Sequence, residues 1–335
     1  MNPLIEVEGL GKTFLDSAFR LGAKRPAVRA VDGVDLTMAR GETLAVVGES
    51  GCGKSTLGRL LLNLIAPSEG RIVFEGAELT AMSAGQMRAM RRRMQMVFQD
   101  PFGSLSPRRT VADTIAEPLA SFGLIGSRAQ KRERVAELLT QVGLPPAVMD
   151  RKPRQFSGGQ RQRIGIARAI SVDPAFVVAD EPVSALDVSI QAQIINLMQD
   201  LQEQKGFSFL FISHDLAVVR HIADRVAVMY LGRIVEIGTK KDIYEAPHHP
   251  YTEALLSSAP DPDPDYRRPD RIILKGDVPS PSRIPSGCAF RTRCPIAQEV
   301  CAAERPPLAP TPAGRLVACH FAAAHPISSN QRPAA

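Results

Sequence analysis

A glycine-rich segment near residue 50 has the residue types and spacing of a phosphate-binding loop. It fits the pattern G-x-x-x-x-G-K-S/T with Gly48, Glu49, Ser50, Gly51, Cys52, Gly53, Lys54, Ser55 and Thr56. The glycines let the backbone wrap closely around a phosphate chain, so that its N–H groups can donate to phosphate oxygens. Lys54 supplies a positive charge for the β- and γ-phosphates, and the Ser55 hydroxyl can bind Mg²⁺. The segment predicts an ATP or GTP site, but alone it identifies no activity.

The chain on either side of this loop has the elements that such a loop requires. An apolar run over residues 43–47 predicts a buried strand leading in, and residues 57–65 repeat apolar side chains at helical spacing. The N-terminus of that helix adds a favourable dipole for a bound phosphate. The alternative, a glycine turn whose lysine is merely solvated, is disfavoured by these flanks.

Polar residues at the ends of predicted strands and helices form four further candidate segments, all later in the chain. Gln99 ends an apolar strand over residues 94–98. A helix opens with Ser157, Gly158, Gly159 and Gln160. An apolar strand over residues 175–179 runs into Asp180 and Glu181, followed by the segment 184–187, and the strand 207–213 runs into His214.

Each of these polar residues has a chemical use beside a bound nucleotide. Asp180, at the carboxyl end of a strand, can hold Mg²⁺ through water beside Ser55. The adjacent Glu181 can polarise an attacking water as a general base. Gln99 offers a neutral amide to the metal or the water, and His214 can bond a phosphate oxygen or keep the water and Glu181 in register. The serine-glycine-glycine segment is a second helix start that can approach a γ-phosphate.

The order of these motifs resembles that of the ATP-binding-cassette (ABC) ATPases. Singly, each motif is more often a plain turn, loop or surface histidine, but five in this order are hard to reach by chance. The segments match the Walker A, Q-loop, signature, Walker B, D-loop and H-loop of that family, over at least residues 4–260. The resemblance implies two ATP molecules sandwiched head to tail between two such domains, with the signature of one facing the Walker loop of the other. It also places Asp187 of the D-loop at the ATP site, and makes Phe14 the candidate to stack on adenine.

Further segments narrow the resemblance to one branch of the family. They lie at residues 99–102, 182–189, 249–252, 285–288 and 291–295. Together they are similar to the ATPase subunits of bacterial oligopeptide and dipeptide importers, and most of all to the second, F-type, of the two paralogous subunits. The match extends over nearly the whole chain.

This resemblance implies an ATPase on the cytoplasmic face of the inner membrane, peripheral to it, that powers peptide import. Its partners would be a second ABC subunit (a paralogue or itself), two permease subunits and a periplasmic or surface substrate-binding protein. Lys54 and Mg²⁺ on Ser55, Asp180 and Gln99 would neutralise charge, while Glu181 activates water. Nickel, glutathione or a peptide-like antibiotic remains an alternative substrate. A soluble ABC protein acting on nucleic acid or ribosomes is less favoured, since those usually carry two cassettes or a long coiled-coil insertion.

The succession of elements predicts an α/β fold. Short N-terminal strands over residues 4–14 and 34–38 predict an antiparallel layer, and alternating strands and helices after residue 158 predict a mainly parallel sheet. We therefore expect an ABC-type nucleotide-binding domain over residues 1–260, with a RecA-like parallel-sheet core and an N-terminal antiparallel β subdomain. Amphipathic patterns within about 100–157 predict a helical subdomain that receives a permease coupling helix. A small extension follows over 261–327, and residues 328–335 are expected to be disordered.

The tail is rich in proline and cysteine. Sixteen of the 27 prolines lie beyond residue 246, and the tail cysteines are Cys288, Cys294, Cys301 and Cys319. Their spacing, C-x5-C-x6-C-x17-C, is not that of a zinc ribbon, and a cytoplasmic setting argues against disulfides. Four thiolates could hold zinc or a 4Fe-4S cluster, either of which would stiffen the tail, or could stay reduced. The resemblance favours the cluster, because members of this importer branch are known with one in this tail.

Composition narrows the partners that the chain could have. The net charge of +6 permits nucleic acid or anionic lipid but requires neither, and the densest basic spots fall in helical patterns with few aromatic residues. We expect no nucleic-acid partner. No run approaches the roughly 20 apolar residues of a membrane span, and the first residues do not resemble a signal peptide. We therefore expect a cytoplasmic chain whose contact with the membrane comes through partners.

Overall fold

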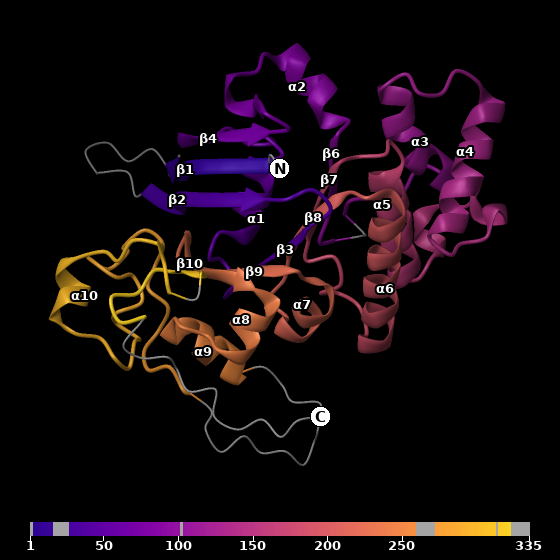
Figure 1. The fold of residues 1–335 in the computed structure, drawn as a ribbon. Coiled ribbons are helices and arrows are strands. Elements are labelled where there is room, and N and C mark those ends of the chain that lie inside the picture. Colours follow the sequence, from indigo (N-terminus) through magenta and orange to yellow (C-terminus); the bar gives the residue numbers. More distant parts are fainter. Residues whose placement is uncertain (1–2, 16–26, 101–102, 259–271, 313, 323–335) are drawn as a thin grey trace, which may run out of the picture.

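The computed structural model describes residues 3–15, 27–100, 103–258, 272–312 and 314–322, and two sheets organise them (Figure 1). A four-stranded sheet has the order β2-β1-β4-β5, and an eight-stranded sheet has the order β11-β12-β10-β9-β3-β8-β7-β6. The domain boundary predicted at residues 260–261, the end 328–335 and residues 101–102 lie outside the described residues.

The N-terminal sheet is antiparallel, as predicted. Its strands are β1 (Ile5–Leu15), β2 (Ala27–Met38), β4 (Glu69–Phe74) and β5 (Ala77–Glu78). β1 pairs with both β2 and β4. β2 begins seven residues before the expected strand, because its polar first half is held by pairing with the end of β1 rather than by an apolar face.

The core of the large sheet is parallel, which confirms the predicted α/β class. Its parallel strands are β3 (Thr43–Val47), β6 (Met94–Val97), β7 (Phe176–Asp180), β8 (Ser208–Ile212) and β9 (Arg225–Tyr230). Every residue of β3, β7 and β8 is buried. Strands covered on both faces read as unbroken apolar runs, which is why the sequence shows them clearly.

Helices cover the core sheet and form a separate cluster beside it. The covering helices include α1 (Lys54–Leu61), α5 (Gly158–Ile170), α6 (Val188–Lys205) and α7 (Leu216–Ile222). The other helices before the tail are α2 (Ala84–Arg91), α3 (Val111–Ser121) and α4 (Arg128–Gln141), with short 3-10 turns at Leu79–Ala81, Pro146–Val148 and Pro153–Gln155. α3 and α4 lie where the helical subdomain is expected, and pack on one another and on α5 (Figure 1). Among the described residues, no helix combines the length and apolar character that crossing a bilayer requires.

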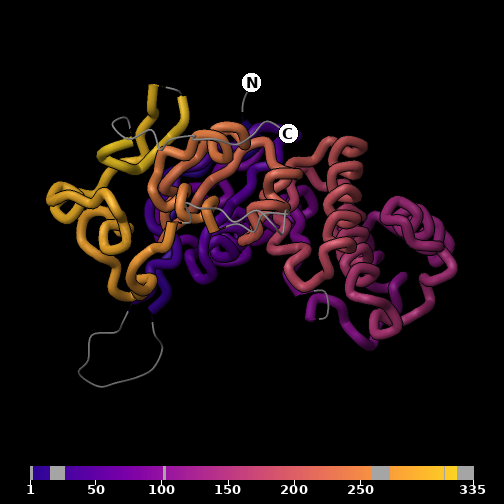
Figure 2. The backbone as a smooth tube through the Cα atoms, turned by 90° about the horizontal axis from the view of Figure 1, so that it is seen from below, coloured from indigo at the N-terminus to yellow at the C-terminus, as the bar shows by residue number. Residues whose placement is uncertain are grey.

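The C-terminal part extends the large sheet. It contains β10 (Arg233–Thr239), α8 (Lys240–Glu245), α9 (Pro250–Ser258), α10 (Glu299–Ala303), β11 (Ala309–Pro310) and β12 (Leu316–Val317). β10 pairs antiparallel with β9, and β12 in turn pairs antiparallel with β10. The tail therefore joins the edge of the core sheet, at the end of the molecule opposite the helices α3 and α4 (Figure 2).

Candidate nucleotide-binding site

The predicted phosphate loop connects β3 to α1, and neighbouring backbones fix two of its glycines. At Gly48, with φ of 151°, a Cβ would lie 2.1 Å from the carbonyl oxygen of Met229 in β9. At Gly53, with φ of 109°, a Cβ would lie 2.0 Å from the carbonyl oxygen of Ala30 in β2. Neither position has room for a side chain, so the loop needs glycine there for both space and conformation.

The loop encloses the ammonium group of Lys54. Its Nζ donates to the carbonyl oxygens of Gly48 at 2.7 Å and Glu49 at 3.0 Å, and the residue is 4% exposed. A buried cation ringed by backbone groups at a helix N-terminus is a setting that favours phosphate.

The next residue, Ser55, is joined to the predicted metal-binding carboxylate. Its hydroxyl donates to Oδ1 of Asp180 at 2.7 Å, and Asp180 is 3% exposed at the end of β7. Burial raises the pKa of this carboxyl and outweighs the opposing effect of the Ser55 hydrogen bond. A hydroxyl and a carboxyl beside the loop are the hard oxygen donors that Mg²⁺ prefers, so these residues fit the predicted ion.

The three predicted catalytic side chains meet at one atom. Oε2 of Glu181 accepts a hydrogen bond from Nε2 of Gln99 at 3.0 Å and lies 3.3 Å from Nδ1 of His214. These residues follow β6, β7 and β8, whose carboxyl ends share one edge of the sheet. Glu181 has a left-handed φ of 45° and is anchored by its N–H, which donates to the carbonyl of Ile212 at 2.9 Å. This backbone strain at a residue of a candidate site is consistent with a functional constraint.

The signature segment forms a separate helix start. Ser157 caps α5: its Oγ accepts from the N–H of Gln160 at 3.3 Å, and Oε1 of Gln160 accepts from the N–H of Ser157 at 3.0 Å. A Cβ on Gly159 would lie 2.5 Å from Cγ2 of Ile190 in α6, which begins after the predicted D-loop residue Asp187. Within the described residues, no hydrogen bond or ion pair joins this segment to the phosphate loop.

Phe14 lies on β1, whose neighbour β2 contacts the loop at Gly53. It pairs in register with Val28, two residues before the Ala30 that touches Gly53. Its ring is 42% exposed, with the ammonium of Lys12 at 5.3 Å from the ring centroid. The ring is therefore exposed and near the loop, and its stacking on adenine stays a prediction.

Two contacts to the loop were not predicted. The Glu49 N–H donates to the hydroxyl of Tyr251 at 2.9 Å, and the Glu49 carboxylate pairs with Arg293 of the tail at 3.0 Å. Tyr251 and Arg293 belong to segments that carry the family resemblance, but nothing in the sequence predicted that either contacts the loop. Arg293 lies 244 positions from Glu49, so no local pattern could have joined them.

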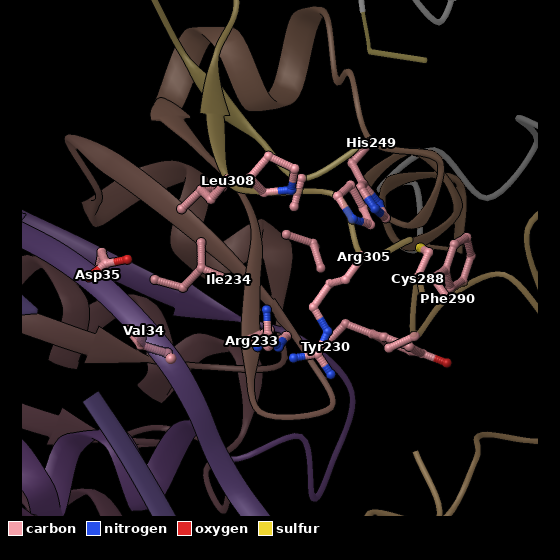
Figure 3. A pocket seen from close by; sticks show the side chains of 16 residues that line it. Val34, Asp35, Tyr230, Arg233, Ile234, His249, Cys288, Phe290, Arg305 and Leu308 are labelled. Carbon is pink, nitrogen blue, oxygen red and sulfur yellow. The ribbon is translucent and has the colours of Figure 1, made fainter. Parts of the chain in front are cut away.

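The tail also packs beside a cavity of about 270 Å³ at its boundary with the core (Figure 3). Arg305 of the tail and Arg233 of β10 line it, and both bond Asp32 of β2, at 3.3 Å and 2.8 Å. Phe290 and Cys288 line the side formed by the tail. The tail is thus held to the core by buried charge and aromatic contacts as well as by β12.

The tail cysteines lie near one another: the charges of neighbouring cysteines raise the pKa values of Cys288, Cys294 and Cys319. Burial, together with smaller contributions from the charges of Cys319, Cys288 and Cys301, raises the pKa of the Cys294 thiol to about 11. Backbone N–H groups that follow Cys288, Cys294 and Cys319 oppose this by donating to their sulfurs. Across the part of the chain that the structure describes, however, no group of three or more His, Cys, Asp or Glu side chains is arranged to hold a metal ion. The thiol donors that the predicted cluster or zinc requires are therefore neighbours, without the geometry of a metal site.

Comparisons with known proteins match both halves of the chain. The family model described as ABC transporter matches residues 31–184, and the one described as oligopeptide/dipeptide transporter, C-terminal region, matches residues 235–301. The chain is 50% identical over 320 residues to the oligopeptide transport ATP-binding protein AppF of Bacillus subtilis, covering 95% of this chain and 97% of that protein. It is 54% identical over 326 residues to the "Probable peptide ABC transporter ATP-binding protein y4tS" of Sinorhizobium fredii, covering 96% and 92%. Among solved structures, the dimeric post-hydrolysis state of the ATP-binding cassette MJ0796 bound to ADP and Pi matches with a TM-score of 0.62 at 28% identity, covering 70% of this chain and 98% of that one.

Proposed function

The chain belongs to the ATP-binding proteins of ABC transporters, and on that premise we propose that it hydrolyses ATP to power the import of di- and oligopeptides. The meeting of Gln99, Glu181 and His214 at one carboxylate oxygen, beside the Ser55–Asp180 bond, carries the catalytic part of the proposal. The match of residues 235–301 to the oligopeptide/dipeptide transporter region, and the names of the relatives, support peptide as the substrate.

We infer a division of labour around the nucleotide. The loop N–H groups and Lys54 bind the phosphates, and Ser55, Asp180 and the Gln99 amide would hold the metal. Mg²⁺ supplies positive charge that stabilises phosphoryl transfer when it is bound. Glu181 accepts the proton of the attacking water at Oε2, and Gln99 and His214 keep that oxygen oriented.

A second ABC subunit completes the site. Ser157 and the two glycines after it lie on α5 without a bond to the phosphate loop of their own chain, which fits a signature that acts on a partner's nucleotide. The related cassette MJ0796 is dimeric in its structure with ADP and Pi. We propose a head-to-tail dimer, with a paralogue or a second copy, in which Ser157–Gln160 and Asp187 face the partner's ATP.

The remaining partners follow from this role. Two permease subunits would carry the peptide, and a periplasmic or surface binding protein would deliver it. The helices α3 and α4 would receive a coupling helix from the permease, with Gln99 joining that contact to the γ-phosphate. The chain would then lie on the cytoplasmic face of the inner membrane, with no nucleic-acid partner.

We also propose that Cys288, Cys294, Cys301 and Cys319 hold a 4Fe-4S cluster, with zinc as the alternative. Their mutual proximity and the backbone N–H groups that donate to three of the sulfurs support a soft-metal site. Binding would have to draw the thiols together into the geometry of a metal site, which the described residues do not have.

Uptake of labelled peptides tests the transport role. Cells lacking this chain should recover the uptake of labelled di- and tripeptides with the wild type and not with Lys54→Ala. Uptake of labelled nickel and of labelled glutathione is measured in the same cells. Restored uptake of one of these without peptide uptake would contradict the peptide substrate, while leaving the ATPase role in place.

A further inference from the structure

The cysteine-bearing tail contacts the phosphate loop directly through an ion pair. The guanidinium of Arg293 spans the carboxylate of Glu49: Nη1 lies 3.0 Å from Oε2 and 3.2 Å from Oε1, and Nη2 lies 3.2 Å from Oε1. The Arg293 side chain is 9% exposed and that of Glu49 is 28% exposed. A bidentate pair with one partner buried has a defined geometry that a loose surface pair lacks.

A second contact from the tail reaches the same loop residue through its backbone. The ring of Phe290 is 1% exposed and packs on Tyr251, with 5.4 Å between the ring centroids. Tyr251 is itself fully buried, and its hydroxyl accepts the hydrogen bond from the Glu49 N–H at 2.9 Å. Side chain and backbone of Glu49 are thus both held from outside the loop, one by the tail and one by a residue on which the tail packs.

The charge of Glu49 gives this contact a consequence for nucleotide binding. Its backbone carbonyl oxygen accepts from the Lys54 ammonium, so the same loop residue carries a carboxylate and contacts the cation meant for phosphate. An unpaired carboxylate there would repel a polyanionic ligand, and repulsion between charges is strong where water is scarce. Arg293 neutralises that carboxylate and also fixes the direction in which it points.

We propose that Arg293 is a positioning residue for nucleotide binding: its ion pair with Glu49 holds and neutralises the phosphate loop, so that ATP affinity depends on the docked tail. This inference rests on the proposed nucleotide site. Arg293 acts through Glu49 and touches no nucleotide itself. The rival explanation is that the pair only fastens the tail to the core.

Variants that remove the charge of Arg293 or of Glu49 distinguish the positioning role from simple fastening of the tail. In the purified full-length chain, Arg293→Ala should raise the Kd for a fluorescent ATP analogue by about tenfold, which corresponds to about 1.4 kcal/mol. Arg293→Lys keeps the charge but cannot form the bidentate contact, so its Kd should lie between those of Arg293→Ala and the wild type. The double variant Glu49→Gln/Arg293→Ala should bind the analogue more tightly than Arg293→Ala does, because the repelling charge is gone.

A matched control comes from the same tail segment. Arg291 bonds Ser286 within the tail, at 2.9 Å, so Arg291→Ala should leave the Kd unchanged. Thermal unfolding of each variant reports whether the tail is merely loosened. A folded Arg293→Ala that binds with wild-type affinity, or a double variant as weak as Arg293→Ala, would overturn the proposal.

The Lys54→Ala variant distinguishes this failure from failure of the nucleotide site itself. If Lys54→Ala loses binding while Arg293→Ala keeps it, only the positioning role is wrong. If Lys54→Ala binds as well as the wild type, the proposed site is wrong and the positioning role falls with it.

Discussion

The hydroxyl of Ser55 donates a 2.7 Å hydrogen bond to the carboxylate of Asp180, across 125 positions of sequence. Ser55 lies at the start of α1, which follows β3, and Asp180 ends β7; β8 lies between β3 and β7 in the sheet. The bond therefore spans the carboxyl edge of the sheet, where open α/β sheets bind their ligands. It places the predicted metal-binding pair beside the phosphate loop.

This pair predicts how the site depends on Mg²⁺. Asp180→Asn keeps an oxygen that can accept from Ser55 but removes the negative charge that favours the cation. We expect the Mg²⁺ concentration that half-saturates ATPase activity to rise about 10- to 100-fold, as when groups supporting a metal are lost. A magnesium titration of the purified transporter measures this, with ATP binding in chelator as the control that should not change. If the half-saturating Mg²⁺ concentration does not change, Asp180 does not bind the metal.

Glu181→Gln tests the proposed general base. Glutamine keeps the size of the side chain and can still meet Gln99 and His214, but it cannot accept a proton from water. We expect kcat to fall by roughly 10²- to 10⁴-fold, the usual contribution of a general base, while the Kd for ATP stays within about twofold. Turnover near the wild-type rate would sink the assigned role.

The parts of this site that lie at strand ends could be predicted from the sequence. β7 and β8 are buried along their whole length, so each gives an apolar run, and the polar residue that interrupts it marks the carboxyl edge. Parallel pairing then brings Glu181 and His214 together without further information.

The contacts of the tail could not be predicted in this way. β12 has two residues, too few to show a periodicity, and it is a strand only because β10 offers it an edge. The Arg293–Glu49 pair depends on how the tail docks, and neither residue stands out locally from other charged residues. Long-range docking of short, irregular segments is set by tertiary packing, which local patterns do not encode.

The tail cysteines predict a metal content that depends on pH. Burial raises the pKa of the Cys294 thiol to about 11, and burial also raises the pKa values of Cys288 and Cys319, so these three metal-free thiols are protonated at neutral pH. Because metal must displace these protons, binding should strengthen as pH rises from about 6 towards 9, a range that lies below the raised pKa of Cys294.

Elemental analysis of anaerobically purified chain measures the metal directly. We expect iron and acid-labile sulfide for a cluster, or zinc alone for the alternative, and loss of either when Cys294→Ser is introduced. Cys52→Ser, which changes a thiol in the phosphate loop, is the control that should keep the metal. If the wild type contains no more iron or zinc than Cys294→Ser, the four cysteines bind no metal and stay reduced thiols.

A buried histidine, His249, directly precedes α9 and predicts that the stability of the fold falls in acid. The ring of His249 is 2% exposed, and burial lowers its pKa from 6.5 to about 3. Its Nδ1 accepts from the N–H of Tyr251 at 3.1 Å, which assigns the ring proton to Nε2. The folded chain therefore binds fewer protons than the unfolded chain below pH 6.5, so the free energy of unfolding falls as pH drops from 6.5 towards 3. The contribution of this one group reaches about 2 kcal/mol at pH 5.

His249→Asn isolates that contribution, because an asparagine oxygen can accept from Tyr251 but does not titrate. Chemical unfolding at pH 7.5 and pH 5 should show the wild type losing about 2 kcal/mol more than the variant between the two conditions. Groups common to both chains, such as the buried carboxyl of Glu236 that accepts from the His249 N–H at 3.0 Å, largely cancel in this difference. His221→Asn, at an exposed site in α7, should follow the wild-type curve. Parallel losses in wild type and His249→Asn would mean that His249 takes up its proton in the folded chain, and that the ring is less enclosed than the packing of Phe290 and Tyr251 requires.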